Sequence, residues 1–76
     1  MANSRNYWTS LNRDRLWCVT QEGTGQVMGM WLTQEAAWEA CKRLARFSRG
    51  EAFLKGRDGS IRLRETYGND PVRSVG

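Results

Sequence analysis

The chain contains no histidine, which is the side chain that most often serves as a general base near neutral pH. A hydrolytic triad would therefore lack its usual proton acceptor. Asp58 and Asp70 are carboxylates in turn-like segments, where aspartate commonly bonds to its own backbone instead of reacting. We therefore expect a protein that is not an enzyme and has no catalytic residues.

Cysteine is also scarce, with only Cys18 and Cys41, and neither belongs to a Cys-x-x-Cys pair. This spacing gives no metal site, and we expect neither a metal nor a cofactor. A disulfide between the two cysteines stays open at this level. Their apolar neighbours favour two free thiols packed as small hydrophobic side chains.

Long apolar runs are missing as well. No segment approaches the ~18–20 apolar residues of a membrane span. The first six residues are mostly polar and lack the apolar core of a secretory signal. Together with free thiols, these features predict a cytoplasmic protein that does not contact a membrane.

The chain has 76 residues, which predicts a single domain over 1–76 with an ordered core from about residue 6 to 71 and loose ends. Lys and Arg number 12 against 8 Asp and Glu, so the formal charge is +4. A domain of this size buries only about 60% of its unfolded surface. We therefore expect a small hydrophobic core and a basic surface.

Three short strands are predicted before residue 32, because β-branched and aromatic residues alternate with turn signals. Within the second strand, Trp17 and Val19 share one face, and Trp17 is expected to anchor the core. The predicted strands are 7–9, 16–20 and 26–31, separated by turns at 12–15 and 22–25.

A helix should follow Thr33, whose hydroxyl is a good N-cap. Leu32 is placed to pack on Ala37 as a hydrophobic staple, Glu39 to pair with Arg43, and Gly50 suits the position after the helix. The apolar stripe at helical spacing consists of Ala37, Ala40, Cys41, Leu44 and Phe47.

A β-hairpin is expected next, from strands 51–55 and 60–65 joined by a turn at Asp58 and Gly59. Alternation should place Ile61 and Leu63 inward, with the neighbouring arginines outward. The order β-β-β-α-β-β predicts a two-layer α+β fold in which one helix packs on an antiparallel sheet.

Clustered cations predict a nucleic-acid partner, because arginine binds phosphate in a bidentate manner and a basic β-ribbon fits a groove or backbone. The competing interpretation is a solvated surface, since helix C-termini and edge strands favour charge in any case. The candidate binding residues are Arg57, Arg62, Arg64, Lys55, Arg46 and Arg49.

The tryptophans support an alternative function. Trp8 and Trp31, if exposed, could dock a host protein or a second copy, because Trp is enriched where proteins bind. A small domain also uses large aromatics simply to fill its core. The sequence leaves open whether the chain is a monomer or a homodimer, and whether the strand at 7–9, taken as an edge strand, pairs across a dimer.

One family likeness is present. The Trp17-Cys18-Val19 strand, the run at 33–36, the turn from Gly56 to Ile61 and the segment Tyr67-Gly68-Asn69-Asp70-Pro71 resemble a family of small bacterial and phage proteins, domain of unknown function 2188. The likeness spans about 17–71. It implies a small ββαββ-type fold and frequent residence on phages and other mobile elements. It implies no reaction, cofactor or catalytic residue.

Overall fold

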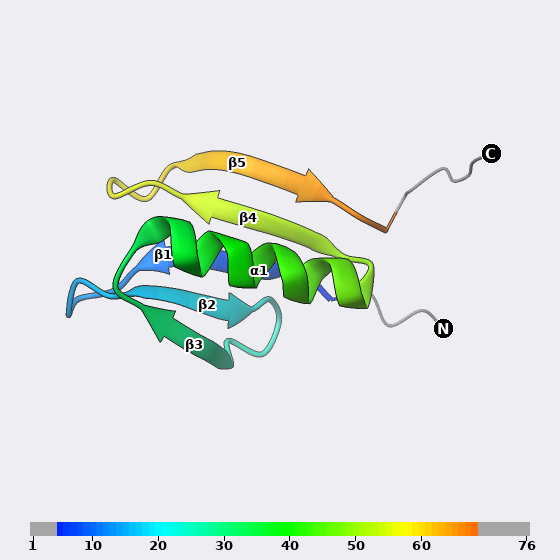
Figure 1. Cartoon of the computed structure of the whole chain (residues 1–76), viewed down its shortest axis with the longest axis horizontal. Helices are drawn as coiled ribbons and strands as arrows, with labels where there is room; N and C mark the ends of the chain where they lie inside the picture. Colours follow the sequence, from blue (N-terminus) through cyan, green and yellow to red (C-terminus); the bar gives the residue numbers. More distant parts are fainter. Residues whose placement is uncertain (1–4, 69–76) are drawn as a thin grey trace.

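A computed structural model describes residues 5–68, in which one helix covers one face of a five-stranded sheet (Figure 1). The α+β class and the order of elements are confirmed. Predictions on residues 1–4 and 69–76, including Asp70, lie outside the described residues. The elements are β1 (Tyr7–Leu11), β2 (Trp17–Gln21), β3 (Val27–Trp31), α1 (Gln34–Ser48), β4 (Glu51–Lys55) and β5 (Ile61–Thr66).

The sheet is mixed, with the strand order β3-β2-β1-β4-β5. β1 and β4 run parallel, whereas the other neighbouring pairs are antiparallel. The prediction of a purely antiparallel sheet is therefore wrong, because α1 returns the chain to the end of the sheet where β1 begins. The prediction of an edge strand at 7–9 is also wrong, since β1 is the central strand.

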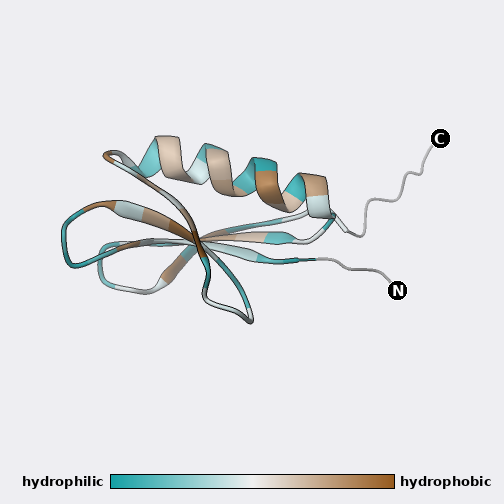
Figure 2. Cartoon of the chain, turned by 90° about the horizontal axis from the view of Figure 1, so that it is seen from below, coloured by the Kyte–Doolittle hydropathy of each residue, from teal (hydrophilic) through white to brown (hydrophobic). Residues whose placement is uncertain are grey.

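The core lies between α1 and the sheet face that it covers (Figure 2). Trp17 and Val19 are buried there on the same face, which confirms their predicted role. Cys41 points into this core from the helix. Cys18 lies between Trp17 and Val19 in β2, and because strand side chains alternate, it is buried on the other face of the sheet. Both cysteines are free, so the disulfide alternative is excluded in this structure.

The helix begins as predicted but ends differently. Thr33 is the N-cap, and its Oγ1 accepts a hydrogen bond from the Ala36 N–H at 3.2 Å. At the other end Arg49, not Gly50, takes the left-handed conformation with φ 60°. Gly50 is needed for another reason, because a Cβ there would overlap the backbone carbonyl of Arg5.

The buried stripe of α1 is rotated from the predicted one. Trp38 is buried, whereas Phe47 is 92% exposed. Phe47 lies six residues after Cys41, which at about 100° per residue places it roughly 120° around the axis from the centre of the stripe. Leu32 is 83% exposed, so the predicted staple on Ala37 does not form.

The two outer strands are poorly covered, because a helix about 10 Å wide shields only the central strands, which are ~4.8 Å apart. Leu63 of β5 pairs with the core residue Leu54, so it lies on the inner face as predicted, but it is 47% exposed. Ile61 pairs with Lys55 beyond a register shift and is 57% exposed, so its predicted inward placement is wrong. Val27 and Met30 on β3 are similarly exposed. Within residues 5–68, no helix is both long and apolar enough to cross a membrane.

Candidate nucleic-acid interface

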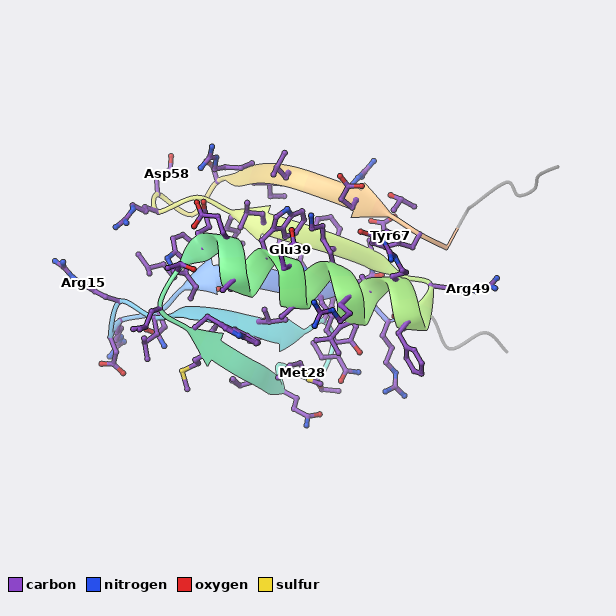
Figure 3. The ribbon with its side chains drawn as sticks, viewed as in Figure 1. Arg15, Met28, Glu39, Arg49, Asp58 and Tyr67 are labelled. Atoms are coloured by element: carbon purple, nitrogen blue, oxygen red, sulfur yellow. The ribbon has the colours of Figure 1, made fainter. Side chains whose placement is uncertain are left out.

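The six predicted cations do not form one surface. Arg49 lies at the C-terminal end of α1, and Asp58, the neighbour of Arg57, lies at the opposite end of the molecule (Figure 3). The structure divides the six residues among a groove, the end of the helix and the uncovered face of the sheet. The cations of the hairpin, expected together on its solvent side or at its tip, are thus divided between the groove and the uncovered face.

Arg57 and Arg62 line a groove of about 720 Å³ between the β4–β5 turn and the first turn of α1. Glu35 and Asp58 line the same groove, so two carboxylates offset the two arginines. Asp58 closes the turn as predicted, since its Oδ1 accepts from the N–H and Oγ of Ser60 at 3.0 and 2.8 Å. These hydrogen bonds lower the pKa of the Asp58 carboxyl.

Arg46 belongs to a second location, beside the last residues of the described chain. Its guanidinium lies 5.7 Å from the ring centre of Tyr67. Burial and the charge of Glu65 raise the pKa of the Tyr67 phenol. On the same helix Glu39 pairs with Lys42 at 3.0 Å instead of the predicted Arg43. Arg46 therefore helps to pack Tyr67 against the helix.

The third location is the sheet face that α1 leaves uncovered (Figure 2). Trp8 of β1 lies opposite Phe53 of β4, and their rings stack with centroids 4.1 Å apart and planes 15° from parallel. Both side chains are half-buried. Their strand neighbours, including Thr9 and Leu54, point into the core, which places the aromatic pair on the other side.

Two cations flank this aromatic pair. The Lys55 Nζ lies 5.2 Å from the centre of the Trp8 ring, and Arg64 is paired with Phe53 across β4 and β5. The Trp8 Nε1 donates to Glu22 Oε1 at 2.7 Å, which holds the indole in place. We call Trp8, Phe53, Lys55 and Arg64 the aromatic face.

Phe53 was missed as a site residue, although the alternation of its strand contained the signal. Ala52 and Leu54 are the inward residues of β4, so Phe53 must share the outer face with Lys55. The stacking of Phe53 on Trp8 depends in addition on the register between β1 and β4, which no local segment of the sequence encodes.

Trp31 does not belong to this face. It is half-buried, packs against the core and pairs with Trp17 in the register of β2 and β3. Its ring lies over Gly29, where a Cβ would come 2.5 Å from Cη2. Trp31 is therefore only partly exposed, and it lies on the opposite face of the sheet from Trp8.

These features define a small two-layer α+β domain, with one helix on a mixed sheet and an open face that carries stacked aromatics. The chain belongs to the family described as "Uncharacterized protein conserved in bacteria (DUF2188)", whose model matches residues 7–67. The match confirms the resemblance and extends it to include β1. Neither a curated protein nor a solved structure matches the chain.

Proposed function

We propose that the domain binds single-stranded nucleic acid on the aromatic face. The observation that carries the proposal is the stacked pair of Trp8 and Phe53, flanked by Lys55 and Arg64 on the uncovered side of the sheet. Aromatic side chains on an open sheet stack with bases, and neighbouring cations bind the phosphates.

A single strand fits this surface better than a duplex does. Aromatic stacking requires a free base face, which an unpaired nucleotide offers and a paired base does not. Each stacked base contributes about 1–3 kcal/mol. Two phosphate contacts, from Lys55 and Arg64, would add a salt-dependent contribution to the binding free energy.

Of the six candidate cations, the proposal keeps Lys55 and Arg64 as binding residues. Arg57 and Arg62 line the groove, where Glu35 and Asp58 offset their charge. Arg46 contacts Tyr67. We therefore place the latter three arginines outside the binding surface.

The proposal includes a cytoplasmic location. Cys18 and Cys41 are both free, and they lie on opposite faces of the sheet. Unpaired thiols persist in a reducing compartment.

The proposal is tested with a matched pair of double variants. Lys55→Glu with Arg64→Glu changes the aromatic face, and Arg57→Glu with Arg62→Glu makes the same charge change at the groove. Affinities for labelled single-stranded DNA and RNA are measured by fluorescence anisotropy. Two phosphate contacts predict a slope of about −1.4 for log K against log salt, or about sevenfold between 50 and 200 mM.

We expect the first double variant to lose most binding and the second to keep most of it. Phe53→Leu, which removes the stack and keeps an apolar side chain, should weaken binding by about 1–3 kcal/mol. If the groove variant alone loses binding, the groove lined by Arg57 and Arg62 and not the aromatic face is the site. If the wild-type chain binds no single-stranded probe at low salt, the proposal fails, and a protein partner for this face becomes the next hypothesis.

A further inference from the structure

The edge strand β3 carries no charge and exposes its apolar side chains. The chain has no Lys, Arg, Asp or Glu from Gly25 to Gln34, although 26% of all its residues are of these types. Within this stretch Val27 is 50% exposed, Met30 is 53% exposed and Leu32 is 83% exposed. Met28 also lies on this side of the molecule, away from β5 (Figure 3).

The opposite edge of the sheet has a different character. β5 exposes Arg62, Arg64 and Glu65 beside its apolar residues. Charged side chains on an edge strand prevent pairing with other chains, which is how natural sheets protect their edges. β3 lacks this protection, and among residues 5–68 no strand pairs with its outer side.

We infer that β3 pairs antiparallel with β3 of a second copy of this chain. An uncharged strand can face itself without bringing like charges together, which would destabilise the ladder. The two-fold arrangement closes on itself, whereas joining β3 of one copy to β5 of the next would be head-to-tail and open-ended. The charges on β5 disfavour that open-ended arrangement.

The second copy would also increase the apolar area that this small domain buries. The helix shields the central strands and leaves Val27 and Met30 in water, so pairing would cover apolar area that the monomer cannot bury. A five-residue edge strand gives an interface at the small end of the known range, below roughly 1,200 Å². The dimer is therefore reversible and dissociates on dilution.

Pairing of this kind keeps the two sheets continuous, with both helices on one side. The two-fold axis of an antiparallel edge pair is perpendicular to the sheet, so both aromatic faces end on the other side. The inference rests on β3 and does not require the aromatic face to bind nucleic acid. A failure of either proposal would leave the other standing.

Two matched double variants test the pairing by sedimentation equilibrium of the whole chain. Val27→Lys with Met30→Lys charges β3, and Ile61→Lys with Leu63→Lys makes the same change on β5. These four side chains are 50%, 53%, 57% and 47% exposed, so both variants add equal charge at similar exposure. Circular dichroism establishes that each variant folds.

We expect the wild-type chain to dimerise as its concentration rises, the β3 variant to dimerise at least tenfold more weakly, and the β5 variant to match the wild type. A wild-type chain that stays monomeric at the concentrations used for NMR would overturn the inference. Equal loss in both variants would also overturn it. If the β3 variant does not fold, amide exchange of the wild type decides, because exchange of the β3 amides should slow as concentration rises.

Discussion

Gly50 lies directly against the backbone carbonyl of Arg5, so that no side chain fits at position 50. Two neighbouring hydrogen bonds fix this contact. The Ser48 Oγ donates to the Arg5 carbonyl at 2.8 Å, and the Glu51 N–H donates to Asn6 Oδ1 at 2.9 Å. The end of α1 and the start of β4 are thereby attached to the residues that lead into β1.

Gly50→Ala should lower the free energy of unfolding by about 3 kcal/mol, because its Cβ meets backbone, which cannot move aside as a side chain does. Gly59→Ala is the control. Gly59 has φ 87° but open space around it, so only backbone strain of about 1–2 kcal/mol is expected. Urea unfolding measures both. If both substitutions lower the free energy of unfolding equally, the backbone at Arg5 moves aside easily.

The two largest apolar residues of the helix should differ sharply in importance. Trp38 is buried and Phe47 is 92% exposed. Trp38→Ala should lower the free energy of unfolding by about 3–5 kcal/mol, because it leaves a cavity in the core. Phe47→Ala should change it by no more than about 0.5 kcal/mol. A large effect at Phe47 would instead indicate a contact that the monomer does not show.

Gly29→Ala should displace the Trp31 ring. The new Cβ would come 2.5 Å from Cη2, so the indole must rotate, at about 1–3 kcal/mol. The indole N–H signal of Trp31 in an NMR spectrum should shift. In a Trp31→Leu background the same glycine substitution should be nearly neutral, and an unchanged cost there would contradict the proposed clash.

Cys41 predicts a loss of stability at high pH. Burial raises the pKa of its thiol above the ordinary value of 9.0. A raised folded-state pKa means that the stabilisation is complete below pH 9.0 and is lost as the pH rises above it. Cys41→Ala should remove this part of the alkaline loss.

Alkylation offers a second measurement on the same thiol. Only the thiolate reacts, so iodoacetamide should modify Cys41 slowly in the folded chain and rapidly in urea. Mass spectrometry of the Cys41 peptide follows the rate. Fast modification of the folded chain at neutral pH would show that the thiol is neither buried nor shifted.

Local signals predicted the features that depend on a few adjacent residues. Thr33 caps the helix because its hydroxyl reaches the Ala36 N–H three residues later. Asp58 and Gly59 form the turn because Gly59 accepts a positive φ. Trp17 and Val19 share a face because strand side chains alternate.

Non-local features escaped prediction for physical reasons. The pairing of Tyr7 with Ala52 depends on where α1 returns the chain, which no short segment encodes. The cations on β5 were assigned by simple alternation. A register shift between Leu54 and Lys55 breaks that alternation, so Arg62 lines the groove while Arg64 faces Phe53. A single irregular position thus separated residues that the pattern grouped together.

The parallel pairing of β1 with β4 at the centre of the sheet determines the order in which the strands can pair. During synthesis β1 leaves the ribosome well before its partner β4, which ends at Lys55. Until then β1 can pair only with β2, and one of its edges stays open. The central ladder therefore closes after α1 has formed, and this long-range step should limit the folding rate more than the local hairpins do.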